Sequence, residues 1–288
     1  MVMKVLTLAE HWITHHSIPV DVWSVALINF IKNNFQGFFN VLSGVLGFLL
    51  GTTTDVLKAV PALILIVIFS VLTYLFKKSW SLALLVFVAL LFVLNQGYWE
   101  PTLETISLII YATVACMVIG VPIGIAAAHR PTLYRIIRPV LDLMQTLPTF
   151  VYLIPTLVLF GLGNVPGLIS TVVFVVPTPV RLTYVGISNV PRQLIEAGLA
   201  FGASPRELLW KVEIPAAMPT ILAGLTQVIM LSLSMVVIAA LVGAGGLGEP
   251  VVEAMETVQI GSGFTSGLAI VVVAVLLDRV FRPAKESS

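Results

Sequence analysis

Residues 192–215, RQLIEAGLAFGASPRELLWKVEIP, form the longest charged passage in a chain that is otherwise largely apolar. The passage lies between two apolar runs and not at an end of the chain. Because charged side chains are costly to place in hydrocarbon, we predict that this segment lies in water. A segment of this kind favours contact with a water-soluble partner.

The segment predicts two short helices separated by a turn. Gly202 supplies the stop that helix ends favour. Three start signals for a second helix follow: a capping hydroxyl at Ser204, a proline in the first turn at Pro205, and the Ser-x-x-Glu box completed by Glu207. Pro215 is expected to prevent smooth continuation into the next apolar run. The predicted product is a compact helix-turn-helix with one apolar and one charged face.

The spacing of these residues resembles the EAA loop of ABC importer permeases, usually written EAA-x3-G-x9-I-x-L-P. The resemblance runs from Glu196 over Gly202 to Pro215 without a slip in spacing. Three positions depart conservatively from the pattern: Gly198 for the second alanine, Val212 for isoleucine and Ile214 for leucine. The alternative is an amphipathic loop that merely connects two spans.

Composition places the chain in a membrane. Of 288 residues, 58% are hydrophobic and 10% are charged, against about a quarter charged in soluble proteins. The net charge of +1 gives no indication of nucleic-acid binding. The single cysteine, Cys116, cannot form a disulfide within the chain. We expect no cleavable signal peptide at the start of the sequence.

The N-terminal part, residues 1–50, is predicted to be an interfacial amphipathic segment ahead of a permease domain at 51–285. Residues 21–35 alternate apolar and polar side chains, which suits a helix in the membrane interface. The apolar run at 38–50 is shorter than the ~20 residues a spanning helix needs. We interpret it as interfacial, with a short span as the alternative.

Histidines near the N-terminus have a spacing that a helix would bring together: His11, His15 and His16. Apart from Glu10, no nearby carboxylate or thiolate joins them, so a solvated segment is favoured over a metal site.

The remaining sequence predicts an all-α, polytopic membrane protein with about six or seven spanning helices. Spans are expected at about 57–76, 80–95, 103–128, 140–160, 166–185, 219–242 and 264–281. Two pairs of glycines within these runs permit close helix contact: Gly120-x3-Gly124 and Gly163-x3-Gly167.

Basic residues set the expected orientation. A topology that places the 192–215 segment in the cytoplasm also places most of the basic residues there: Lys77, Lys78, Arg130, Arg135, Arg138, Arg181, Arg192, Arg206, Lys211, Arg279, Arg282 and Lys285. The opposite side receives acidic residues instead: Glu100, Glu104, Glu249, Glu253 and Glu256. The positive-inside rule therefore agrees with the orientation chosen from the loop.

No motif supports an enzyme. Gly243, Gly245 and Gly248 spell G-x-G-x-x-G, but the preceding run has the length of a membrane span and not of a strand. We interpret these glycines as a turn after a span; alternatively, residues 243–256 form an outer loop that touches a docked carrier protein. The sequence holds no phosphate-binding P-loop and no nucleophile-histidine constellation, so a separate subunit would have to hydrolyse ATP.

Charges within the spans are few. Asp142 and Arg181 lie near predicted cytoplasmic ends, where snorkelling or capping explains them. The lack of charge near the middle of the spans argues against a proton or sodium relay. It suits a permeant without net charge.

The resemblance extends to residues 139–161 and 231–248, which are similar to spans of the glycine betaine/proline betaine (osmoprotectant) branch, whose members also handle choline and carnitine. The likeness covers about residues 100–247. The competing class is an ion-coupled secondary transporter, but inverted repeats are not visible and the charged loop stays unexplained. A structural scaffold is a third option, disfavoured by the prolines within the spans.

The resemblance implies a type I importer fold whose coupling helix-turn-helix, at about 186–218, docks on an ABC ATPase. Glu196 would pair with a basic group of the ATPase, Gly202 would make the turn, and Ala203 through Arg206 would contact its groove. The loop residues implicated are Glu196, Ala197, Gly198, Gly202, Ala203, Ser204, Pro205, Arg206 and Pro215. Candidates for the translocation path are Met144, Gln145, Tyr152 and Met235, although core packing explains them equally well.

The implied partners are two copies of the ATPase, which would carry ATP and Mg²⁺, an extracytoplasmic substrate-binding protein, a second copy of this chain, and membrane lipid. No catalytic residue, metal or cofactor is expected on the chain itself. The expected location is the cell's inner or plasma membrane, crossed several times.

Overall fold

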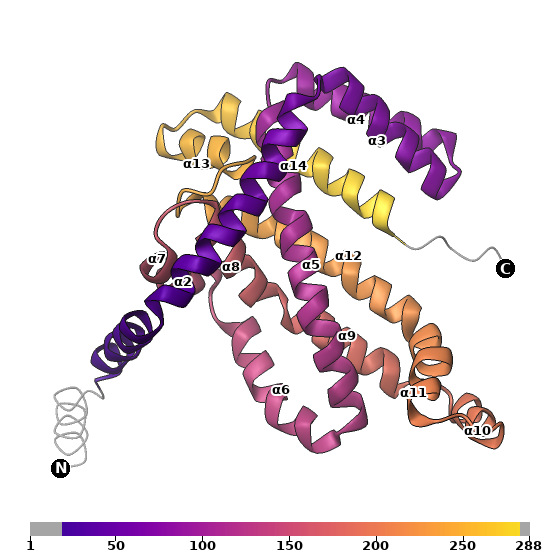
Figure 1. The fold of residues 1–288 in the computed structure, drawn as a ribbon. Helices are drawn as coiled ribbons and strands as arrows, with labels where there is room; N and C mark the ends of the chain where they lie inside the picture. The colour runs from indigo at the N-terminus through magenta and orange to yellow at the C-terminus, as the bar shows by residue number, and fades with distance from the viewer. Residues whose placement is uncertain (1–18, 283–288) are drawn as a thin grey trace, which may run out of the picture. The chain divides into compact units, whose positions relative to one another are not determined.

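The computed structural model describes residues 19–282, and within this range the chain forms helices and no strand (Figure 1). The all-α class is therefore confirmed. The predicted choice between a solvated segment and a metal site at the three N-terminal histidines lies outside the described residues.

The chain divides into two compact units, residues 1–42 and 43–288. Helix α2, Val20–Ala59, runs across this division and is kinked at Phe35, whose φ of −120° and ψ of 16° are not helical. The predicted boundary at residue 50 thus falls inside a helix, and the division into an interfacial segment and a permease domain stays a prediction. By length and composition, α2 is able to cross a membrane.

A helix occupies every run predicted to span the membrane. The helices that follow α2 are α3 Ala62–Lys77, α4 Trp80–Asn95, α5 Trp99–His129, α6 Pro131–Thr146, α7 Thr149–Phe160, α8 Asn164–Val175, α9 Pro177–Ser188, α10 Arg192–Ala200, α11 Pro205–Leu208, the π-helical turn Leu209–Glu213, α12 Ile214–Ala240, α13 Gly248–Glu256 and α14 Ile260–Phe281. Among the described residues, 5 helices are long and apolar enough to cross a membrane, or up to 6 if one bent pair counts as a span. Helices α3 and α4 are shorter, with 16 residues each.

The run predicted to span the membrane at 140–160 contains a sharp bend. Helices α6 and α7 meet at a bend of 96°. Leu147, at the bend, has an extended backbone with φ −64° and ψ 135°. Pro148 explains this, because the ring of a proline clashes with a helical conformation of the preceding residue.

Regular α-helix does not continue smoothly into Pro215, as expected, although the helix as a whole runs from Pro205 to Ala240. In a regular helix the proline ring would clash with the carbonyl of the residue four positions earlier. Here the preceding turn is π-helical, and the Ile214 N–H donates to the carbonyl oxygen of Leu209, five residues back. This wider turn accommodates the proline without ending the helix.

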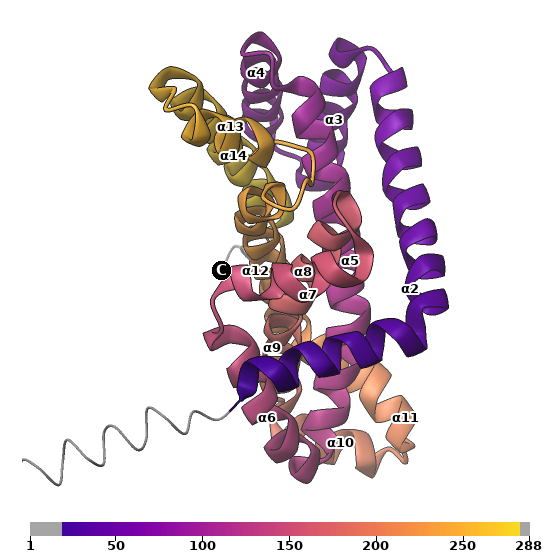
Figure 2. The same cartoon turned by 90° about the vertical axis from the view of Figure 1, so that its left-hand side faces the viewer.

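Helices α5, α8, α9 and α12 pack together at the centre, whereas the α3–α4 hairpin packs against α14 (Figures 1 and 2). The α5–α9 crossing depends on the predicted glycine pair. A Cβ on Gly124 would lie 2.6 Å from the Cβ of Thr183 and 2.7 Å from the carbonyl oxygen of Val180. Gly120 similarly leaves no space between α5 and Pro179. Close backbone approach at this crossing is therefore possible only without side chains.

Candidate coupling loop and membrane path

The turn between α10 and α11 is closed by backbone hydrogen bonds. Gly202 has a left-handed φ of +76°, which glycine adopts without strain. Its N–H donates to the carbonyl oxygen of Leu199 at 2.9 Å, and the Ala203 N–H donates to that of Gly198 at 3.0 Å. This pair of bonds is a Schellman motif, so the predicted helix stop at Gly202 is confirmed.

The start of α11 is a complete capping box. The Glu207 N–H donates to Ser204 Oγ at 3.4 Å, and the Ser204 N–H donates back to Glu207 Oε2 at 3.1 Å. Lys211 Nζ lies 2.9 Å from Glu207 Oε1. The Lys211 contact, followed by the bonds from Ser204, lowers the pKa of the Glu207 carboxyl to about 2. The cap is therefore complete above the ordinary pKa of glutamate and is lost only as the pH falls toward that lowered value.

Gly198 explains one departure from the EAA pattern. A Cβ at this position would lie 2.8 Å from Leu208 Cδ1 and 3.5 Å from Val212 Cγ2. The two helices of the loop thus touch at a glycine, and an alanine there would require only the flexible end of Leu208 to move. Ala and Gly are both compatible with this crossing.

One face of the loop is attached to the membrane bundle. Ile195, Leu209 and Ile214 pack against a buried cluster that includes Ile187 of α9 and Ala217 of α12. Because these contacts join both helices of the loop to the bundle, a displacement of the loop moves the helices that it joins.

The opposite face is open. Glu196, Pro205 and Arg206 are exposed, and the Phe201 side chain between the two helices is 93% exposed. Among the described residues, Glu196 makes no ion pair or side-chain hydrogen bond. An exposed charged and aromatic surface of this kind is suited to docking against another protein.

A side-chain hydrogen bond that the sequence did not reveal joins α5 to this loop. His129 Nε2 lies 2.8 Å from Glu213 Oε2, and the glutamate is buried while the histidine is half-exposed. The two residues are 84 positions apart. The only local signal is a glutamate between apolar residues, at a position that the EAA pattern leaves unspecified.

Three of the predicted path residues gather at the α6–α7 bend. The Tyr152 hydroxyl donates to the carbonyl oxygen of Met144 at 2.5 Å, and Gln145 Nε2 donates to Thr178 Oγ1 of α9 at 3.4 Å. Met235, in contrast, is only 1% exposed and packs within the bundle. The path role of all four residues stays a prediction.

Helix α6 is joined to α9 by polar and aromatic contacts. Arg181 Nη2 lies 2.5 Å from Asp142 Oδ1, and the rings of Tyr134 and Tyr184 are stacked with centroids 3.6 Å apart. Asp142 and Arg181 thus pair with each other, and the expectation that they snorkel or cap at span ends stays a prediction.

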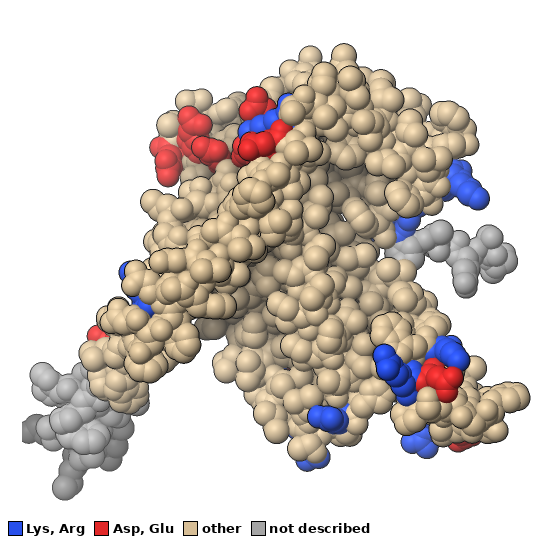
Figure 3. All heavy atoms as spheres, viewed as in Figure 1, with Lys and Arg blue, Asp and Glu red and all other residues tan. Residues whose placement is uncertain are grey.

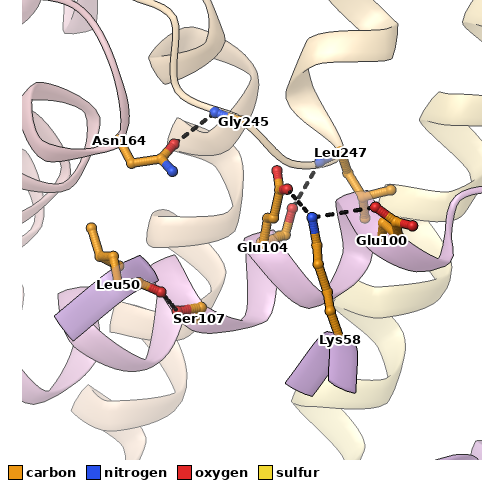
Figure 4. A network of polar contacts seen from close by, with 9 residues as sticks. Leu50, Lys58, Glu100, Glu104, Ser107, Asn164, Gly245 and Leu247 are labelled. Atoms are coloured by element: carbon orange, nitrogen blue, oxygen red, sulfur yellow. Dashed lines mark hydrogen bonds and ion pairs between the residues drawn. The ribbon is translucent and has the colours of Figure 1, made fainter. Parts of the chain in front are cut away.

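At the other end of the bundle, polar contacts join α2, α5 and the loop after α12 (Figure 4). Lys58 Nζ lies 2.7 Å from Glu104 Oε1 and 3.3 Å from Glu100 Oε2. The Leu247 N–H donates to Thr105 Oγ1 at 2.8 Å. These contacts join helix ends that the predicted topology places on the outer side of the membrane.

The G-x-G-x-x-G residues belong to this outer network. A Cβ on Gly245 would overlap the Glu104 carboxylate, and one on Gly248 would overlap the carbonyl of Val236. The Gly245 N–H donates to Asn164 Oδ1 at 2.7 Å. Because helix α12 precedes the loop, the interpretation as a turn after a span is confirmed, and contact of residues 243–256 with a docked carrier protein stays a prediction.

Across residues 19–282, no group of three or more His, Cys, Asp or Glu side chains is placed to hold a metal ion. The polar side chains instead form pairs and caps that position helices. The arrangement provides a docking loop at one end and a bent helix pair beside α9, with no catalytic constellation in the described part of the chain.

Comparison with known proteins identifies the class. Residues 120–282 match the family of the binding-protein-dependent transport system inner membrane component, and the chain belongs to this family. It is thus a permease subunit of the ABC importer type and a multi-pass membrane protein.

Individual relatives narrow the resemblance to one branch. The glycine betaine permease OpuAB of Bacillus subtilis is 43% identical over 90% of this chain and 91% of its own length. The glycine betaine/proline betaine permease ProW of Escherichia coli is 40% identical over 91% of this chain and 74% of its own length. The glycine betaine/carnitine permease GbuB of Listeria monocytogenes is 41% identical over 92% of this chain and 94% of its own length. The resemblance to the glycine betaine/proline betaine branch is confirmed.

The fold also matches a solved importer. An inward-facing structure of the MetNI methionine ABC transporter has a TM-score of 0.56 at 25% identity, covering 67% of this chain and 96% of that chain. The type I importer architecture predicted from the sequence is therefore confirmed.

Proposed function

We propose that this chain is the membrane-spanning subunit of an ATP-driven importer for a compatible solute: glycine betaine, proline betaine, choline or carnitine. The loop formed by α10, α11 and the π-helical turn would couple ATP hydrolysis in a partner ATPase to movement of the spans. The observation that carries this proposal is the two-faced loop, whose apolar side is packed into the bundle and whose charged side is open.

The loop is built to transmit displacement. The Schellman turn and the capping box fix the angle between its two helices, and the π-helical turn connects the second helix to α12 without a break. A partner that pulls on the exposed face would move α12 along its whole length. The contacts of Ile195 and Leu209 would carry the same displacement to α5 and α9.

The assembly would contain two ATPase copies, each occupied by ATP and Mg²⁺, and two copies of this chain, each supplying one loop. Closure of the ATPase pair would draw the two loops together and tip the spans from inward-open to outward-open, a two-state change biased by nucleotide. Glu196 would pair with a basic group of the ATPase, while Ala203 through Arg206 would contact its groove. The chain would bind no cofactor itself.

The proposed substrate class follows from the solutes that the relatives are named for and from the charges in the bundle. An extracytoplasmic binding protein would capture the solute, because aromatic cages hold quaternary ammonium groups by cation–π attraction. In the spans, the charged groups Asp142 and Arg181 neutralise each other. A permeant without net charge, such as a betaine zwitterion, is compatible with this neutral path.

Competitive uptake in vesicles tests the proposal. Vesicles that contain this chain, its ATPase and its binding protein should accumulate labelled glycine betaine only when ATP is supplied, and unlabelled proline betaine, choline or carnitine should compete. Vesicles without the binding protein are the matched control. Uptake driven by a sodium or proton gradient without ATP would instead establish the secondary-transporter alternative.

A further inference from the structure

A cavity of about 440 Å³ lies where the α3–α4 hairpin meets the C-terminal end of α14. Three basic side chains line it: Lys77 from α3 and Arg279 and Arg282 from α14. Figure 3 shows Lys and Arg side chains on the right-hand side of the molecule, in the region of the hairpin and the end of α14. The volume of the cavity is within the range of small-molecule sites, roughly 300–1,000 Å³.

The positive charge in this cavity is largely uncompensated. Arg279 makes no ion pair with any residue that the structure describes. Arg282 lies 3.3 Å from Asp278, but among residues 19–282 no carboxylate lines the cavity itself. Lys77 Nζ donates to the main-chain oxygen of Arg282 at 2.5 Å, which fixes the ammonium at the cavity. The lining is therefore suited to an anion.

The start of α4 adds hydrogen-bond donors on the same side. Ser79 is the N-cap of this helix of 16 residues, and Ser79 Oγ lies 3.1 Å from Ser81 Oγ. Both serines line the cavity. The Leu82 N–H donates to Ser79 Oγ at 3.4 Å, whereas the earlier N–H groups of the helix have no partner within it and, together with the helix dipole, favour an anion at this position.

The surroundings of the cavity are apolar and face outward. Leu82 and Leu85 complete its lining. Next to the cavity, Phe76 is 78% exposed and Trp80 is 74% exposed, with the Trp80 ring 4.5 Å from that of Tyr74. Exposed aromatic side chains beside cationic groups are typical of the membrane–water interface.

We propose that this cavity binds the phosphate headgroup of an anionic membrane phospholipid from the cytoplasmic leaflet. The three cations and the two serine hydroxyls hold the phosphate, while the acyl chains lie along the exposed apolar surface of Leu85 and Trp80. Basic pockets between helices on the cytoplasmic side bind anionic headgroups in this way. The predicted topology places the cavity on that side. The inference depends on the fold and topology, not on the solute transported.

The experiment compares lipid retention in charge-matched variants. The full chain is purified in detergent, mixed with equal amounts of phosphatidylglycerol and phosphatidylcholine, and the bound lipids are counted by native mass spectrometry. The test variant is Arg279→Gln with Arg282→Gln. The matched control is Arg130→Gln with Arg135→Gln, which removes two cytoplasmic charges outside the cavity. The same samples are then titrated with inorganic phosphate.

The native chain and the control should retain phosphatidylglycerol in preference to phosphatidylcholine. The test variant should lose this preference by roughly 25-fold, because each cation near an anionic lipid contributes about fivefold. A thermal melt within the range of the control shows that the test variant is folded. If it misfolds, Ser79→Ala with Ser81→Ala provides the second test and should weaken the same preference.

Two outcomes would overturn the proposal. Equal loss of phosphatidylglycerol in the test and control variants would show a general charge effect and no site. Displacement of the lipid signal by inorganic phosphate at the same concentration would show a free-anion site, since such phosphate lacks the acyl chains.

Discussion

Glu196→Lys is expected to abolish ATP-driven uptake while the chain still folds and inserts into the membrane. The Glu196 side chain is exposed and makes no ion pair within the described residues. Reversing its charge therefore removes no contact that stabilises the fold. At the interface with the ATPase, the change would place like charges together, which costs about 2–5 kcal/mol, equivalent to a loss of at least ~30-fold in affinity. Uptake in reconstituted vesicles and copurification of the ATPase measure the effect.

Gln193→Lys is the matched control, because it adds the same charge to the exposed surface of α10, outside the EAA positions. Uptake by this variant should stay near that of the native chain. Glu196→Gln, which removes the charge without reversing it, should fall between the two. Unchanged uptake in Glu196→Lys would contradict the coupling role of this residue.

Gly124→Val is expected to prevent folding or to lower the melting temperature strongly. The new side chain would overlap Thr183 and the main-chain oxygen of Val180 at the α5–α9 crossing. Because a backbone atom cannot move aside as a side-chain end can, the overlap separates two central helices. We expect the free energy of unfolding to fall by about 3 kcal/mol, the upper part of the range for overpacking. This corresponds to a melting temperature about 10 °C lower.

Gly267→Val in α14 is the control, since nothing lies within 4 Å of a Cβ at Gly267. Its melting temperature in detergent should stay close to that of the native chain. An equal decrease in both variants would show that valine is poorly tolerated in these spans generally and that the α5–α9 contact is not special.

The conformation of the helix-turn-helix at 192–213 could be predicted closely because its determinants are local. The stop at Gly202 and the capping box at Ser204 and Glu207 depend on residues within a few positions of one another. The same holds for the spans, since hydrophobicity over a window of residues decides them. Local patterns of capping residues and hydrophobicity therefore define which segments are helical and where each helix begins and ends.

The effect of a proline depends on its surroundings. Helices α6 and α7 meet at a sharp bend at Pro148, whereas the helix runs on through Pro215. The difference lies in the π-helical turn before Pro215, which no pattern in the sequence indicated. The bend at Pro148 follows from the restriction that a proline places on the preceding residue, Leu147.

Side-chain pairs that join distant helices could not be predicted. Asp142 and Arg181 are 39 residues apart, and Lys58 and Glu104 are 46 residues apart. Their proximity follows from how the helices pack, and a single sequence carries no signal for this. The sequence indicated that these charges exist and near which side of the membrane they lie.

Labelling of a single cysteine in the loop tests the central claim most directly. Cys116 is fully buried and Ala203 is partly exposed, so Ala203→Cys provides the one accessible thiol in the described part of the chain. A membrane-impermeant maleimide should label this cysteine in inside-out vesicles and not in right-side-out vesicles, and bound ATPase should protect it. Labelling from the outside, or labelling at the same rate with and without the ATPase, would contradict a cytoplasmic loop that couples this permease to ATP hydrolysis.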